Sequence, residues 1–151
     1  MEATRPEDFD AEEPEVAERD AIQGRLQVSD LQGCAPLVKL LDSDSAAVLC
    51  GAASALYNLT LARENADALL PLNALPKLCT LLEHDDAAVK AAIAGVLMNV
   101  CATSSRCRSE LAYTGLLPTL LGQISTPVED PLTSEAEVRK NALGVLNNLM
   151  L

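Results

Sequence analysis

The side chains best suited to catalysis in this sequence are one histidine and five cysteines. His84 lies in the acidic stretch 83–86, a setting typical of a solvent-exposed turn. Nucleophilic catalysis needs a nucleophile and a base within hydrogen-bonding reach, and the sequence places no cysteine beside His84. Glycine-rich phosphate loops and the H-E-x-x-H and G-x-S-x-G patterns are also absent. We therefore predict a protein that is not an enzyme and that uses no cofactor.

The cysteines favour reduced thiols over disulfides or a metal site, because their number is odd and no C-x-x-C pair occurs. Most of them lie in apolar stretches, where a thiol packs as a small hydrophobic side chain. Cys107 differs because it lies between Arg106 and Arg108, whose positive charges would lower its pKa. A thiol-reactive or redox-regulated protein that acts through Cys107 is therefore the alternative from another functional class.

A second kind of polar side chain recurs at fixed places, because an asparagine follows a valine by ten residues in three segments. The amides are Asn58, Asn99 and Asn148. Counted from each valine, positions 4, 7, 8 and 11 are apolar, a spacing that marks one face of an α-helix. The asparagine lies on another face, so one amphipathic helix is repeated with an amide on each copy. An amide offers two donors and an acceptor, which can pair with the main chain of a partner segment.

Two shorter helices are expected before each of these long helices. One begins near a proline, which suits the first turn of a helix, over residues 36–41, 76–82 and 118–124. Each proline follows a residue that tolerates the left-handed conformation at the end of a helix, namely Gly33, Asn73 or Gly115. The other short helix precedes that residue, at 64–72, at 106–114 and around Leu26 and Leu31. Three helices in a period of about 40 residues predict an α-solenoid.

Polar loops at 42–45 and 83–86 supply N-cap oxygens for the long helices. The third loop, 125–137, is longer and ends in Ser134-x-x-Glu137, the pattern of a capping box. A loop of this length is either a tolerated insertion or a functional segment.

Charge separates the chain into two parts. Residues 1–20 hold nine acidic and two basic side chains, a formal charge of −7 out of −11, and we predict an acidic disordered arm there. It would be a solvated leader, a docking tail or an autoinhibitory segment. Residues 21–151 form the predicted repeat domain. No basic cluster is present, so we expect no nucleic-acid partner.

The start of the chain shows no apolar signal segment, and no apolar run approaches about 18 residues. Together with reduced cysteines, this predicts a soluble cytoplasmic protein with no membrane partner; the nucleus is the alternative location.

The repeat resembles the armadillo repeat family. Residues 33–36, 73–76 and 115–118 are similar to its G-x-x-P opening, and residues 55–59, 96–100 and 145–149 are similar to its A-L-x-N-L helix. The resemblance covers residues 20–151 with three motifs in register, and it implies an armadillo-type right-handed α-solenoid of three-helix repeats. It also implies that the third helices line a concave groove, where Asn58, Asn99 and Asn148 hold the main chain of a partner segment. The alternative is that these amides bridge neighbouring helices.

The chain departs from the family where import adaptors carry tryptophan, one turn before the asparagine. Ser54, Gly95 and Gly144 occupy those positions, and the chain contains no tryptophan. Cation–π cages for lysine are therefore unavailable, and recognition of basic nuclear localisation signals is not expected. One turn further back lie small, uncharged residues, including Asn141. We predict a smooth, shallow groove that accepts a helix as readily as an extended strand, with Ser54, Gly95, Gly144 and Asn141 added to the three amides.

The last long helix ends in apolar residues with nothing after it to cover them. Solenoids need a polar capping unit, so we expect either a fragment or short isoform of a longer armadillo protein, or dimerisation through this face. The predicted function is a non-enzymatic protein–protein interaction module, a scaffold or adaptor. The alternative is the client-binding region of an assembly chaperone, such as those of the dynein-arm type; a regulator of small GTPases also remains open.

Overall fold

The computed structural model describes residues 14–151, which fold into nine helices with no strand among them. The predictions for residues 1–13 lie outside the described residues. The helices are α1 (Pro14–Asp30), α2 (Cys34–Leu40), α3 (Ala46–Leu59), α4 (Arg63–Ala68), α5 (Ala74–Leu81), α6 (Ala87–Thr103), α7 (Ser105–Ala112), α8 (Leu116–Ser125) and α9 (Ser134–Leu149). The all-α solenoid of three-helix units is thus confirmed.

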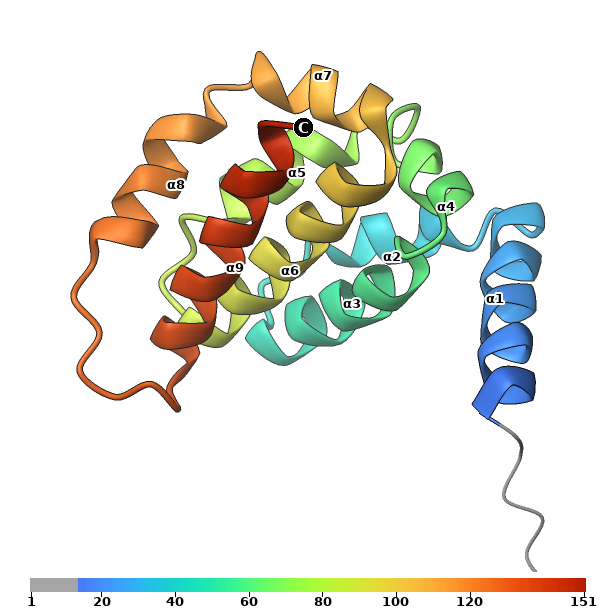
Figure 1. The fold of residues 1–151 in the computed structure, drawn as a ribbon, viewed down its shortest axis with the longest axis horizontal. Helices are drawn as coiled ribbons and strands as arrows, with labels where there is room; N and C mark the ends of the chain where they lie inside the picture. The colour runs from blue at the N-terminus through green and yellow to red at the C-terminus, as the bar shows by residue number, and fades with distance from the viewer. Residues whose placement is uncertain (1–13) are drawn as a thin grey trace, which may run out of the picture.

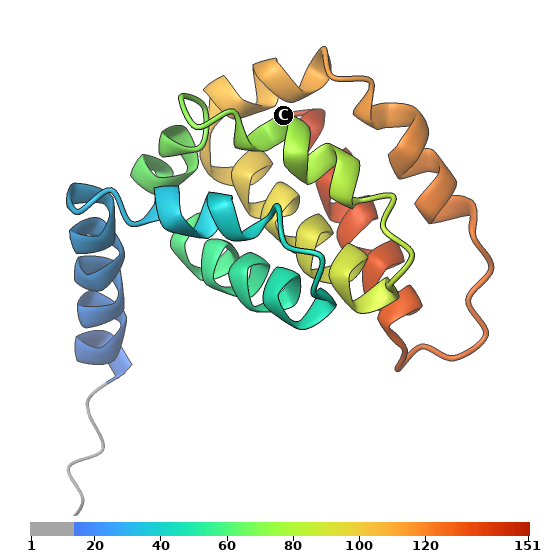
Figure 2. The same cartoon turned by 180° about the vertical axis from the view of Figure 1, so that it is seen from behind.

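The long helices α3, α6 and α9 lie side by side in one layer, and the proline-started helices α2 and α5 lie behind them (Figures 1 and 2). Units α4–α6 and α7–α9 each contain the predicted short, proline-started and long helices. In the first unit α1 takes the place of the short helix. It stands apart from the body and buries none of its residues. Its link to the body includes Asn65, whose Nδ2 donates to the Arg25 carbonyl oxygen at 2.9 Å.

Three sequence predictions at the ends of helices need correction. Residues 14–20, assigned to the disordered arm, form the exposed start of α1. The residue that caps α9 is Thr133 and not Ser134, because the Thr133 side chain accepts from the Ala136 N–H at 3.3 Å. Since α9 begins at Ser134, the long loop is confined to residues 126–133.

The first chain reversal is also different from its two counterparts. Asn73 and Gly115 have positive φ angles of 52° and 73°, as predicted, but Gly33 has a φ of −66° and the left-handed residue is Gln32. A side chain is excluded at Gly33 for another reason, since a Cβ there would lie 2.4 Å from Cγ1 of Val28. Glycine is thus required by the close approach of α1 to the start of α2.

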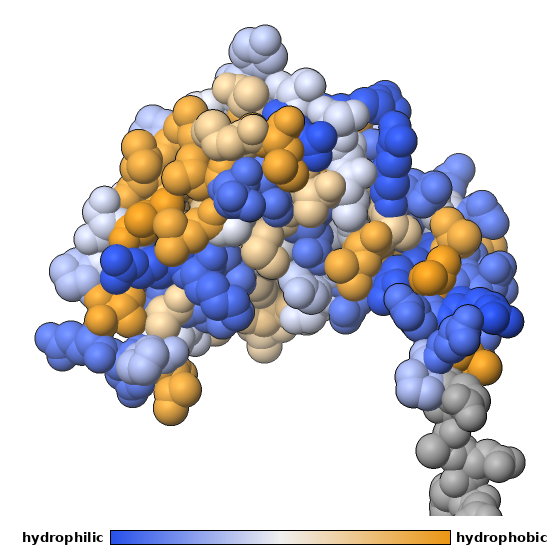
Figure 3. Space-filling view, in the orientation of Figure 1, coloured by the Kyte–Doolittle hydropathy of each residue, from blue (hydrophilic) through white to orange (hydrophobic). Residues whose placement is uncertain are grey.

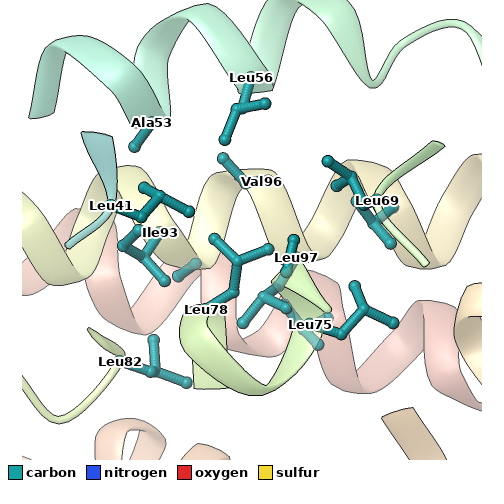
Figure 4. Packing of buried hydrophobic residues seen from close by; sticks show 14 of the residues in the cluster. Leu41, Ala53, Leu56, Leu69, Leu75, Leu78, Leu82, Ile93, Val96 and Leu97 are labelled. Carbon is teal, nitrogen blue, oxygen red and sulfur yellow. The ribbon is translucent and has the colours of Figure 1, made fainter. Parts of the chain in front are cut away.

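The core is aliphatic and centres on α6 (Figure 4). Ile93, Val96 and Leu97 of α6 are fully buried, together with Leu56 of α3 and Leu78 of α5. Burying each such side chain contributes about 1.5–3 kcal/mol. With almost no aromatic residues in the chain, small and branched side chains let the helices approach closely. No single helix of residues 14–151 has the length and apolarity to cross a membrane; α6 and α7 meet that test only as a pair, bent by 119°.

Candidate functional site

The start of each long helix is fixed by a side chain that accepts hydrogen bonds from the first turn. Asp86 accepts from the N–H groups of Ala88 and Val89 at 2.8 and 3.2 Å, and Ser45 accepts from that of Val48 at 3.4 Å. Together with Thr133 at the start of α9, these caps set where α3, α6 and α9 begin. The caps of α3 and α6 lie three residues before the repeat valine, whereas Thr133 lies five residues before Val138, so α9 begins two residues earlier in the repeat.

A depression of about 500 Å³ lies between these three helices. Four of the seven predicted site residues line it: Ser54, Asn58, Gly95 and Asn141. The others in its lining are Tyr57, Ala91, Ala92, Met98, Glu137 and Lys140. The structure thus brings together one of the three repeat amides, Asn58, with Asn141, and leaves Asn99, Asn148 and Gly144 outside the depression.

The amides of the second and third units bridge neighbouring long helices. Asn99 Nδ2 donates to the Tyr57 carbonyl oxygen at 2.8 Å, and Asn148 Nδ2 donates to that of Met98 at 3.0 Å. In each case the acceptor is the residue just before the asparagine of the preceding unit. The bridging alternative thus describes these two amides, and their contact with a partner stays a prediction.

Asn58 and Asn141 show the two extremes of amide exposure in the depression. Asn141 is buried, and its Nδ2 donates to the Ala91 carbonyl oxygen at 3.1 Å. Asn58 is exposed and its amide has no hydrogen-bonding partner within residues 14–151, because α1, which precedes α3, stands apart from the body. Asn58 therefore offers both its donors and its acceptor to a ligand.

The surface between the long helices is less smooth than Gly95 and Gly144 predict. A Cβ on Gly95 would lie 3.1 Å from Cδ2 of Tyr57, and one on Gly144 would lie 2.4 Å from Sδ of Met98. The side chains of Tyr57 and Met98, which both line the depression, therefore pack over these two glycines. Sequence reasoning missed both residues, although each directly precedes a repeat asparagine.

Electrostatics in the depression are close to neutral. Its charged lining residues are Glu137 and Lys140, which form an exposed ion pair at 3.1 Å. An exposed pair of this kind contributes little to stability, and the two charges compensate each other. The site therefore has no strong preference for an acidic or a basic ligand.

The hypothesis of a reactive Cys107 is wrong. Its side chain is fully buried, burial raises the pKa of the thiol, and Sγ donates to the Ala66 carbonyl oxygen at 3.3 Å. Arg106 lies 3.9 Å from a carboxylate oxygen of Asp67, which offsets its charge. Burial also raises the pKa of Cys101, to about 12. Both thiols are therefore protonated at neutral pH and shielded from oxidants.

His84 has a structural role in the turn before α6. Its Nδ1 accepts from the Asp86 N–H at 3.0 Å, which orders the residue that caps the helix. Within residues 14–151 no group of three or more histidine, cysteine or acidic side chains is arranged to hold a metal ion.

Comparison with known proteins shows what the chain is similar to. The Armadillo/beta-catenin-like repeat matches residues 23–61. No curated protein matches the sequence. Among solved structures, a designed armadillo repeat protein is 28% identical with a TM-score of 0.72, over 84% of this chain and 51% of that one.

Two further designed proteins relate the fold to peptides. One, a designed armadillo repeat protein in complex with the peptide (KR)4, is 26% identical with a TM-score of 0.72, over 84% of this chain and 51% of that one. The other, computationally designed for modular peptide recognition, is 29% identical with a TM-score of 0.67, over 79% and 48%. This chain thus spans about half the length of the designed proteins that it matches.

Proposed function

We propose that this chain, whose residues 23–61 match the armadillo repeat and whose fold is similar to that of designed armadillo repeat proteins, is a scaffold or adaptor. It would bind a peptide segment of a partner protein in the depression between α3, α6 and α9. The observation that carries this proposal is that Tyr57 and Asn58, neighbours in sequence, both line the depression. Asn58 has an open amide, and Tyr57 is 38% exposed. The amide can hold a main chain while the ring covers an adjacent side chain.

The chemistry of the lining indicates which segment would bind. The designed relative that holds (KR)4 binds an alternating basic peptide, whereas the charges here are a single compensated pair, Glu137 and Lys140. We therefore expect a segment with an uncharged apolar or aromatic side chain next to Tyr57. Shape and main-chain hydrogen bonds would supply the specificity, and affinity would depend only weakly on salt.

The experiment is selection of binders from a random peptide library, followed by affinity measurements on two single variants, Tyr57→Ala and Asn58→Ala. Both leave the bridging amides intact, which replacement of all three repeat asparagines would not. Tyr113→Ala is the matched control, because Tyr113 is 91% exposed and lies outside the depression. Circular dichroism establishes that the variants are equally helical.

We expect Tyr57→Ala to weaken a selected peptide by at least about tenfold, the effect of losing a central aromatic contact. Asn58→Ala should cost less, and Tyr113→Ala nothing. Peptides whose affinity is the same for Tyr57→Ala and the original protein would place binding elsewhere and reject the depression as the site.

A further inference from the structure

The segment that joins α8 to α9, residues 126–133, is the longest stretch without a helix inside residues 14–151. It loops away from the body at one edge of the molecule (Figures 1 and 2), and Figure 3 shows hydrophilic side chains with a few apolar ones at this edge. The corresponding polar loops at 42–45 and 83–86 are exposed or half-buried throughout, although a further unit follows each of them. The exposure of residues 126–133 therefore belongs to this position of the repeat and does not depend on what lies beyond α9.

The main chain at the start of this segment is extended and unpaired. Thr126 has a ψ of 125°, in the range that a following proline imposes. No main-chain N–H or carbonyl group of residues 126–129 forms a hydrogen bond within residues 14–151. Enzymes that modify peptide segments bind them extended, with contacts to the main chain. Residues 126–129 already have this form, and only the last turn of α8 has to open for the residues before them to follow.

Thr126 carries the hydroxyl that such an enzyme would modify. The residue is exposed, and its Oγ1 donates to the Gly122 carbonyl oxygen at 3.0 Å. Of all the serines and threonines in the chain, it alone is followed directly by a proline. Proline-directed protein kinases select this pair, since proline has a fixed φ and no N–H that the enzyme must satisfy. Sequence pattern, exposure and main-chain conformation thus coincide at one residue.

We propose that Thr126 is a phosphorylation site for a proline-directed protein kinase, with Mg²⁺-bound ATP as the phosphoryl donor. The hydroxyl oxygen of Thr126 attacks the γ-phosphorus, and the bond from that phosphorus to the bridging oxygen breaks as the new bond forms. ADP leaves, and the hydroxyl proton passes to the catalytic aspartate of the kinase. This modification goes beyond the peptide-binding function and does not depend on it.

Phosphorylation would loosen the end of α8. A phosphate adds a charge of about −1.5 to −2 at neutral pH, and Thr126 lies at the C-terminal end of α8, where the helix dipole is negative. The esterified Oγ1 has no proton left to donate to the Gly122 carbonyl oxygen. Both changes destabilise the last turn of α8, residues 122–125.

The charges around Thr126 do not offset this effect. Two acidic side chains follow within four residues of it. The basic side chains of Arg139 and Lys140 line a depression with Val128, but Thr126 does not belong to that lining. The repulsion at the end of α8 therefore dominates.

A second hydroxyl near the same segment separates sequence pattern from conformation. Ser134 is followed by Glu135 and Glu137, a pattern that acid-directed kinases select. Ser134 is, however, half-buried and is the first residue of α9, so its main chain is helical and cannot be bound extended. We expect an acid-directed kinase to phosphorylate a peptide of residues 125–140 at Ser134 but not the folded chain.

The experiment treats the folded chain with a proline-directed kinase and Mg²⁺-ATP and locates the phosphate by tandem mass spectrometry. Thr126→Val removes the acceptor, and Pro127→Ala keeps the acceptor but removes the proline. Ser125→Ala is the matched control, because Ser125 is an exposed neighbouring hydroxyl that no proline follows. Circular dichroism establishes that all variants are equally helical. Hydrogen exchange then compares residues 122–125 with and without the phosphate.

We expect one phosphate, on Thr126, in the original chain and in Ser125→Ala, and none in Thr126→Val. Pro127→Ala should react at least about tenfold more slowly, the effect of losing one recognised side chain. Amides of residues 122–125 should exchange about two- to fivefold faster after phosphorylation, as the helix dipole predicts. A phosphate on another residue, an unchanged rate for Pro127→Ala, or transfer to a peptide of residues 121–133 but not to the folded chain would overturn the site. Unchanged exchange would overturn the effect on α8.

Discussion

Helices α6 and α9 share the same repeat motif but differ in how many long helices pack beside them. α6 lies between α3 and α9 and buries residues on every side, including Gly95 and Asn99. α9 has a long helix on one side only, and it buries Val138, Asn141, Ala142 and Val145. A repeated sequence therefore fixes the helix, and the neighbouring helices decide what each of its positions contributes to stability or to binding.

The largest expected effect comes from replacing the leucine that α6 and α9 each carry at the same position of the repeat. Leu97 of α6 is fully buried and Leu146 of α9 is half-buried. Leu97→Ala should lower the free energy of unfolding by about 2–5 kcal/mol, and Leu146→Ala should lower it by less than half as much. Urea unfolding at low protein concentration measures both. Equal losses at low concentration would mean that the outer side of α9 is covered in the monomer, against the structure.

The repeat asparagines provide a test of intermediate size. Asn99→Ala removes the hydrogen bond to the Tyr57 carbonyl oxygen at the end of α3, which still accepts from the Thr60 hydroxyl at 3.2 Å. The free energy of unfolding should therefore fall by about 0.5–1.5 kcal/mol, the net contribution of one hydrogen bond. Asn58→Ala removes an exposed amide, so its effect should lie within about 0.5 kcal/mol. Chemical denaturation of the two variants gives the difference. If Asn58→Ala were as damaging as Asn99→Ala, the amide of Asn58 would have a structural partner.

Much of the fold was predictable because it depends on local chemistry. Apolar spacing gave the long helices, prolines gave the short ones, and polar loops gave the caps of α3 and α6. Contacts between segments far apart in sequence were not predictable in this way. An example is the hydrogen bond from Asn65 Nδ2 to the Arg25 carbonyl oxygen, 40 residues away, which no local pattern contains.

For the candidate site, the sequence predicted which residues lie on one surface but not how their side chains pack. The motif correctly placed Ser54, Asn58, Gly95 and Asn141 around one depression. It did not indicate that Tyr57 covers Gly95, because the direction of a side chain across a helix interface depends on the neighbouring helix. Cys107 shows the same limit, since flanking arginines predict a reactive thiol only where the thiol is exposed.

The smallest test compares two helical glycines. A Cβ on Gly51 would have no atom within 4 Å, whereas one on Gly144 would lie 2.4 Å from Sδ of Met98. Gly51→Ala should therefore raise the free energy of unfolding by about 0.5–1 kcal/mol, because alanine restricts the unfolded chain and favours the helix. Gly144→Ala should lose part or all of that gain, since Met98 must move. Thermal unfolding compares the stability of the two variants. If Gly144→Ala raised the free energy of unfolding as much as Gly51→Ala, Met98 would be free to leave the interface between α6 and α9.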